Sequence, residues 1–147
     1  MVETVRGILK SKGSQVWSLD AEATVYEAIA LMAEKGIGAL LVVSEGKLVG
    51  ILSERDYARK VILKGKSSRT TPVREIMSSP VITVTPEHTV AECMKIITTH
   101  RIRHLPVLEG EQLVGVVSIG DLVNSIISTQ AATIHQLSSY ISGKYPA

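Results

Sequence analysis

The sequence repeats itself at a spacing of 65 residues, and this repeat limits the possible folds more than any other feature. Residues 50–56 read GILSERD and residues 115–121 read GVVSIGD, so a glycine, two aliphatic residues, a serine and an aspartate recur in the same order. Shifting the chain by 65 positions aligns residues 16–62 with residues 81–127 without a gap. Ungapped agreement over such a length indicates that a structural unit has been duplicated.

Each copy predicts the same order of elements: strand, helix, strand, strand, helix. The first strands are expected at residues 16–19 and 81–84. The helix that follows begins with a Thr-x-x-Glu capping box in both copies, at Thr24 and Glu27 and at Thr89 and Glu92. Gly36 is expected to end the first of these helices, because glycine accepts the left-handed conformation that is common at helix ends.

A hairpin and a second helix complete each copy. Apolar runs at 39–43 and 48–52, and again at 105–108 and 113–117, are joined by short polar turns that contain Gly46 or Gly110. This pattern is typical of β-hairpins. The second helices are expected to begin near Ser53 and Ser118, because apolar residues follow both serines at helical spacing.

A unit of this size, with three short strands, has too little core to fold by itself. We therefore predict a mixed α/β (α+β) domain in which two βαββα repeats pack about a pseudo-twofold axis. The expected organisation is an N-terminal arm at 1–15, repeats at 16–63 and 81–128, a connection at 64–80, and a helical tail at 129–147. None of these parts would house a catalytic domain, so we expect a protein that is not an enzyme.

Composition is consistent with a folded protein in a reducing, cytoplasmic compartment. Cys93 is the only cysteine, which excludes an intramolecular disulfide and a site with several cysteine ligands, and its alignment with Ala28 predicts a thiol in the core. The longest apolar run is far shorter than a membrane span. A net charge of +2 is too small to indicate a nucleic-acid partner by itself.

The Ser-x-x-Asp pattern at the start of each second helix has two interpretations. A serine three residues before an acid is a helix-capping signature, which requires no ligand. The first helices, however, use the longer Glu for capping, whereas both second helices use Asp. A helix start at the carboxyl end of a strand is also where α/β sheets bind ligands. The residues alone leave both interpretations open.

The second interpretation predicts a ribonucleotide site. The unpaired amides and partial positive charge of a helix start suit a phosphate, and the serine hydroxyl adds a donor. An aspartate repels phosphate but accepts hydrogen bonds from neutral hydroxyls. The pair therefore suits a ligand that carries a phosphate beside vicinal hydroxyls.

These patterns together resemble a known family. The doubled unit with G-x-x-[ST]-x-x-D, the M-x-x-x-x-I-T-V motif at 77–84, and the RHLPV motif at 103–107 resemble the cystathionine β-synthase (CBS) domain pair, also called a Bateman module. The resemblance is closest to stand-alone bacterial members. It implies a non-catalytic regulator that binds AMP, ADP, ATP, NAD or S-adenosylmethionine in two clefts between the repeats and signals to a partner by conformational change.

The resemblance also implies roles for individual residues. Asp56 and Asp121 would accept from ribose hydroxyls, and Ser53 and Ser118 would contact phosphate. The first cleft would comprise Ser53, Arg55, Asp56, Val81, Ile82, Thr83, Ile102, Arg103, His104 and Pro106. The second cleft would comprise Trp17, Ser18, Ile37, Gly38, Ala39, Ser118 and Asp121.

The two clefts are not expected to be equal. Arg103 and His104 align with Gly38 and Ala39, so the first cleft has cationic donors that the second lacks. Because charge-assisted hydrogen bonds contribute about 1.5–3 kcal/mol each, we expect the first cleft to bind phosphates more tightly. For AMP, about 0.3 kcal/mol for each of about 23 heavy atoms gives a Kd near 10 μM.

An alternative function is a nucleic-acid-binding regulator that uses the basic connection at 60–74. Its cations are Lys60, Lys64, Lys66, Arg69 and Arg74. Aromatic residues are only 3% of the chain and do not alternate with these cations, which disfavours this alternative. The histidines show no spacing typical of metal ligands, so no metal site is expected.

The two ends of the chain predict self-association. Residues 121–141 have the apolar spacing of one amphipathic helix that ends by Gly143. Together with Val2, Val5, Ile8 and Leu9 of the arm, this helix would offer apolar surface to a second copy, and CBS pairs commonly dimerise. We therefore expect a homodimer.

Overall fold

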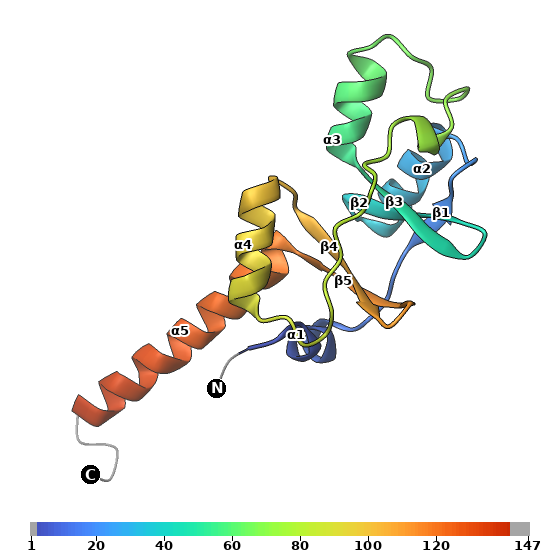
Figure 1. The fold of residues 1–147 in the computed structure, drawn as a ribbon. Helices are drawn as coiled ribbons and strands as arrows, with labels where there is room; N and C mark the ends of the chain where they lie inside the picture. Colours follow the sequence, from blue (N-terminus) through green and yellow to red (C-terminus); the bar gives the residue numbers. More distant parts are fainter. Residues whose placement is uncertain (1–2, 142–147) are drawn as a thin grey trace.

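A computed structural model describes residues 3–141 of the chain, with side chains described as far as residue 130 (Figure 1). The first repeat contains β1 (Ser18–Asp20), α2 (Val25–Lys35), β2 (Ala39–Ser44), β3 (Lys47–Ser53), α3 (Glu54–Tyr57) and η1 (Ala58–Ile62), a turn of π-helix. The second contains α4 (Val90–His100), β4 (His104–Glu109), β5 (Gln112–Ser118) and α5 (Ile119–Ile141). Two further elements lie outside these runs, α1 (Val5–Lys12) and the 3-10 turn η2 (Val73–Glu75).

The two hairpins have the same register, which confirms the duplication. Ala39 pairs with Ser53 in the first repeat, and His104 pairs with Ser118 at the equivalent place in the second. Both ladders shift register at equivalent points, after Val42 and after Val107. The predicted order of mixed helices and small sheets is therefore confirmed.

The first strand of each repeat departs from the prediction. In the first repeat it lies at Ser18–Asp20, two residues later than its expected start, and runs parallel to β2. In the second repeat the expected strand at 81–84 is reduced to a single parallel bridge between Val84 and Val107. The reason is a proline. Leu41 donates its amide to Trp17 O in the first repeat, whereas Pro106 stands at the equivalent place and has no N–H to donate.

The predicted caps of the first helices are confirmed. Thr24 and Glu27 form a reciprocal capping box at α2, and Thr89 and Glu92 form one at α4. Gly36 ends α2 in the left-handed conformation with φ 66°. Arg101 adopts the same conformation at the end of α4, with φ 55°, so a non-glycine residue fills the equivalent position there.

The second helices differ in length. The helix after Ser53 ends in η1 at Ile62, whereas α5 continues for 23 residues to Ile141. The long C-terminal helix is therefore confirmed as far as Ile141, and its expected end at Gly143 lies outside the described residues. In Figure 1, α5 extends well away from the rest of the second repeat.

Each repeat has its own buried core. Val25, Met32, Leu40 and Leu52 are at most 2% exposed in the first core. The second core is built at the matching places from Val90, Ile97, Leu105 and Val117. Cys93 is fully buried in the second core, which confirms the prediction of a core thiol.

The N-terminal segment is not a free arm. Val5 and Ile8 of α1 are buried in the second core, so the expectation that they offer apolar surface to a partner is wrong. Val2 lies outside the described residues, and Leu9 is half-buried against the same core. The matching surface of the first core is covered by Val73 and Ile76 from the expected connection.

The two covering segments make matching contacts at a different spacing. Segments 3–9 and 71–77 share Val, Arg and Ile at a shift of 68 residues, three more than the shift that relates the repeats. The amide of Val5 donates to His88 O at 2.9 Å, and the amide of Val73 donates to Ala23 O at 2.8 Å. Each core therefore takes its cover from the segment that precedes the other repeat, and the three extra residues hid this relationship.

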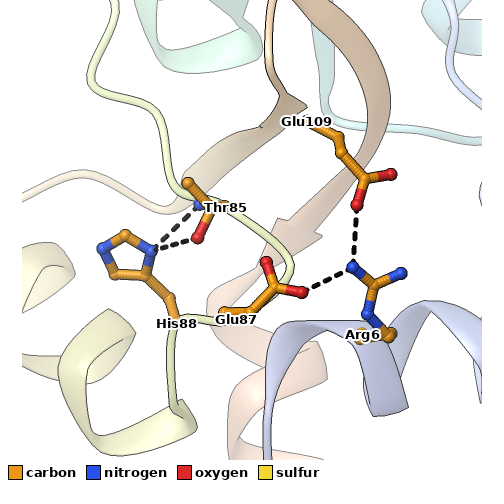
Figure 2. Close-up of polar contacts among 5 residues, drawn as sticks. All are labelled: Arg6, Thr85, Glu87, His88 and Glu109. Carbon is orange, nitrogen blue, oxygen red and sulfur yellow. Dashed lines mark hydrogen bonds and ion pairs between the residues drawn. The ribbon is translucent and has the colours of Figure 1, made fainter.

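A pair of ion pairs fastens α1 to the second repeat (Figure 2). Arg6 Nη2 lies 2.5 Å from Glu87 Oε1 and 2.8 Å from Glu109 Oε2. The hydrogen bond from Arg6 lowers the pKa of Glu87 below its ordinary value. Beside it, the Thr85 amide donates to His88 Nδ1 at 3.0 Å, which shapes the turn that receives Val5. Arg74 and Glu22 form the matching pair on the first repeat.

Candidate functional site

A cleft of about 580 Å³ lies between the repeats and is called the first cleft. The first repeat contributes the start of α3, with Ser53 and Asp56. The second repeat contributes Ile102, Arg103 and His104, where the chain leaves α4 and enters β4. Residues from both repeats are thus required to form this cavity.

Most residues predicted for the first cleft line it. They are Ser53, Arg55, Asp56, Val81, Ile82, Ile102, Arg103 and His104. Thr83 and Pro106 do not line it, and Pro106 is buried. Gly38, which was assigned to the second cleft, lines the first.

Sequence reasoning missed several lining residues. They are Ile51, Glu54, Arg59, Lys60, Ser78, Pro80, His100 and Arg101. Arg59 and Lys60 follow Asp56 by one helical turn, and that spacing is a signal that places them beside it. His100 and Arg101 come from the end of α4, which no motif pointed to.

The first cleft carries an excess of positive charge. Five cationic side chains line it against two carboxylates, and the cations are Arg55, Arg59, Lys60, Arg101 and Arg103. Only Lys60 among them has an acidic partner within the described residues, Asp56 at 3.2 Å. The remaining cations favour an anionic ligand, because arginine binds phosphate and carboxylate through paired hydrogen bonds.

The helix starts at both serines are reciprocal caps. Asp56 donates its amide to Ser53 Oγ at 3.2 Å, and its Oδ2 accepts from the Ser53 amide at 2.9 Å. Ser118 and Asp121 do the same at 3.1 and 2.8 Å. The argument that Asp is too short for this role is therefore wrong, because the extended backbone at Ser53 brings its amide within reach of the carboxylate.

Capping leaves acceptor capacity on both carboxylates. Asp56 uses Oδ2 for the cap and Oδ1 for Lys60. Asp121 uses Oδ2 both for the cap and for Lys12 Nζ, 2.7 Å away. Within the part of the chain that the structure describes, no hydrogen bond reaches Asp121 Oδ1. A carboxylate oxygen has room for more than one donor, so capping and ligand binding are compatible.

Opposing effects set the pKa of Asp121. Burial raises it, whereas the hydrogen bonds from Lys12 and from the Ser118 amide lower it further, so the net shift is downward. Asp121 is therefore ionised at neutral pH despite its partial burial.

A smaller cavity of about 210 Å³, called the second cleft, lies at the equivalent place. Its lining includes the predicted residues Trp17, Ile37, Ala39 and Ser118. Asp121 does not line it, because Lys12 covers its carboxylate. Ser18 is exposed and lies outside it, since alternation along β1 turns its side chain to the opposite face from Trp17.

The second cleft does have a cationic side chain, contrary to the sequence-based expectation. Lys12, from the end of α1, lines it together with Gln15. No reasoning within the repeats could find Lys12, because it belongs to neither of them. Trp17 packs against the first core and carries Lys35 over its ring at 4.4 Å from the centroid.

His104 lines both clefts. Burial lowers the pKa of His104, the nearby Asp121 raises it by less, and Lys12 and Arg103 lower it further. The imidazole is therefore held neutral at physiological pH, and a phosphate placed in either cleft would favour its protonated form.

The basic connection is largely neutralised. Lys66 lies 3.8 Å from Glu75, Arg74 lies 2.9 Å from Glu22, and Arg69 stacks on Tyr26 at 4.2 Å. A surface whose cations are paired offers few free charges to a nucleic-acid backbone. The structure therefore adds nothing in favour of the nucleic-acid alternative.

Two searches of the described residues returned nothing. No group of three or more His, Cys, Asp or Glu side chains is arranged to hold a metal ion in the part of the chain that the structure describes. Within residues 3–141, none of the helices combines the length and apolar content of a bilayer span.

Comparison with known proteins identifies relatives of the whole module. The sequence matches the family model described as CBS domain at residues 6–63 and 73–128. It is 41% identical to the CBS domain-containing protein CBSX3, mitochondrial, of Arabidopsis thaliana, over 97% of this chain and 73% of that protein.

Solved structures share the fold. A protein with CBS domains from Burkholderia ambifaria MC40-6 is 53% identical, with a TM-score of 0.84 over 86% of this chain and 96% of that one. The CBS domain pair of protein MJ0100, solved in complex with 5′-methylthioadenosine and S-adenosyl-L-methionine, is 25% identical, with a TM-score of 0.78 over 88% and 99%.

Proposed function

Because the chain belongs to the CBS domain family, we propose that it is a non-catalytic regulatory module that binds an adenine nucleotide in the first cleft. Proteins made of CBS domains are generally regulatory, and no catalytic domain is found in the matched residues. The related pair of MJ0100 was solved with two adenosine-type ligands, which supports an adenosine-type ligand here.

The observation that carries the proposal is the composition of the first cleft. Ser53 and Asp56 from one repeat lie across the cavity from Arg103 and His104 of the other. Asp56 would accept from the ribose hydroxyls, and Arg103 with Ser53 would hold the phosphate. A neutral ligand would leave the excess positive charge of this cleft without a partner, so we favour AMP, ADP, ATP or NAD over S-adenosylmethionine.

The volume of the first cleft supports a ligand of nucleotide size. Ligand sites in proteins commonly enclose about 300–1,000 Å³, and the first cleft, at about 580 Å³, falls within that range. The second cleft, at about 210 Å³, is below it. We therefore propose that the first cleft binds nucleotide before the second does and with higher affinity.

Signalling would follow from the position of the ligand between the repeats. A nucleotide that contacts Asp56 and Arg103 joins two units that have separate cores, and so favours the relative orientation that best satisfies both contacts. A ligand shifts such an equilibrium only by its difference in affinity for the two shapes. The partner protein that reads this change is not identified by the structure.

We also propose that the chain forms a homodimer through the second helices. Ile62 and Ile127 occupy equivalent positions in the two repeats, and they are 58% and 57% exposed. Leu63 and Val123 extend this apolar surface at 77% and 38% exposure. A second copy offers the same repeated pattern, so it can cover both positions at once. Light scattering over a range of concentrations tests this, with Ile62→Glu and Ile127→Glu expected to give monomers.

A thermal shift panel tests the nucleotide proposal. AMP, ADP, ATP, NAD and S-adenosylmethionine are added to the wild type, to Asp56→Ala and to Glu54→Ala as a matched control on the same helix. Ligand at about 100 times its Kd should stabilise the wild type and the control by about 2.7 kcal/mol, and Asp56→Ala by clearly less. The absence of a shift with all five ligands would overturn the proposal.

A further inference from the structure

The second cleft contains a permanent cation that neither repeat supplies. Lys12 Nζ donates to Asp121 Oδ2 at 2.7 Å and to Val116 O at 3.0 Å. It therefore joins the end of α1 to the end of β5 and the start of α5. Among the described side chains that line this cleft, Lys12 is the one with a fixed positive charge, since His104 is held neutral.

The first cleft is arranged differently at the equivalent place. Pro80 follows Lys12 by 68 positions, the shift that relates α1 to the other covering segment, and Pro80 lines the first cleft. Proline carries no charge, so Asp56 takes its cation from Lys60 on its own helix. The residue equivalent to Lys60 in the second repeat is Ser125. The two carboxylates thus draw their cations from opposite sides.

We propose that Lys12 determines the ligand preference of the second cleft, which selects adenosine ligands that carry a phosphate over those that carry none. This inference rests on the proposed function. Without ligand, Lys12 holds the carboxylate of Asp121 and closes the cleft. A ribose that binds Asp121 weakens that ion pair, and the phosphate of the same ligand then becomes the acceptor for the Lys12 ammonium. A nucleoside without phosphate competes with Lys12 for Asp121 and gives the ammonium no new acceptor.

The exposure of the pair suits such an exchange. The Lys12 side chain is 39% exposed and that of Asp121 is 20% exposed, so the ammonium can move without opening the core. The helix that carries Lys12 stays fixed meanwhile, because Val5 and Ile8 are buried and Arg6 is ion-paired. Movement is therefore needed only in the long Lys12 side chain.

The test isolates the second cleft with the Asp56→Ala variant and measures AMP and adenosine binding by calorimetry. Lys12→Met in that background should weaken AMP binding by about tenfold or more, the effect of one charge-assisted hydrogen bond. Adenosine binding should stay equal or become tighter, so that the preference for AMP disappears. Lys12→Arg should keep the preference. Lys10→Met, on the exposed side of the same helix, is the matched control and should change neither affinity.

Other outcomes overturn the inference in distinguishable ways. If Lys12→Met weakens AMP and adenosine equally, Lys12 supports only the fold, and if it tightens both, Lys12 is only a lid. An unchanged preference for AMP would show that Lys12 does not contact phosphate. If the wild type binds AMP and Asp56→Ala binds neither ligand, the second cleft is not a site, although the proposed function stands. If the wild type binds no adenine ligand, the proposed function itself fails.

Discussion

Val5 and Val73 fill equivalent positions in two different cores, although they are 68 residues apart while the repeats are 65 apart. Each is fully buried, and each donates its amide to the loop that precedes a capped helix. The first repeat is thus covered by the segment before the second, and the second by the segment before the first. This exchange ties the two repeats into one folding unit and brings Lys12 to the second cleft.

The exchange predicts that α1 stabilises the protein as much as the connection does. Ile8→Ala and Ile76→Ala each remove a buried side chain from an equivalent place, so each should lower the free energy of unfolding by about 2–4 kcal/mol. Urea denaturation measures both. Ile62→Ala, at an exposed position, is the control and should change stability by less than about 0.5 kcal/mol. An effect of Ile8→Ala as small as that of the control would show that α1 is not part of the core.

A second prediction concerns the close approach of α1 to β5. A Cβ added to Gly115 would lie 2.7 Å from Leu9 Cδ2, so Gly115→Ala should destabilise the protein by about 1–3 kcal/mol. Leu9→Ala makes room for that methyl group, and the double variant should therefore be more stable than the sum of the single effects. A double-mutant cycle in urea measures this coupling. Strict additivity would contradict the contact.

Cys93 should be unreactive in the folded protein. Burial raises the pKa of its thiol to about 11, and the nearby Glu92 raises it further, so very little thiolate exists at pH 8. Ellman's reagent should label Cys93 only after unfolding in denaturant, which provides the positive control. Rapid labelling under native conditions would contradict the burial of this side chain.

The pH dependence of stability should contain a contribution from His104. Its pKa in the folded protein lies below the ordinary value of 6.5, so the unfolded chain binds the proton more readily. The stabilisation is fully present above about pH 6.5 and is lost as the pH falls through the lower, folded pKa. Asp121, Lys12 and Arg103 surround the imidazole, and none of them titrates in that window.

Urea denaturation between pH 7.5 and 5.5 measures this contribution. The wild type should lose more stability than His104→Gln as the pH falls over that range, which brackets the ordinary histidine pKa of about 6.5. His100→Gln, at an exposed position, should behave like the wild type. Parallel curves for the wild type and His104→Gln would contradict the assignment.

The elements that the sequence predicts well are those with local causes. The capping boxes at Thr24 and Thr89 and the hairpin turns at Gly46 and Gly110 depend on a few neighbouring residues, and all are found. The first strand of the second repeat fails because the residue that decides it, Pro106, lies on the partner strand.

The rest depends on contacts between segments that are far apart in sequence. Lys12 reaches Asp121 across 109 positions, and only the fold of α1 onto the second repeat brings them together. The first cleft was predicted better than the second, because both of its sides lie within the repeats and carry recognisable motifs. The second cleft takes one side from outside the repeats, where no motif points to it.

The most direct test of the account is a titration of AMP into isotope-labelled protein, followed by amide NMR. At about 1 mM AMP, a hundred times the expected Kd of about 10 μM, the amides of Ser53, Asp56, Arg103 and His104 should shift first and most. Those of the second cleft, around Ser118, should shift only at higher concentration. Unchanged amides around the first cleft at that concentration would contradict the claim that it is a nucleotide site.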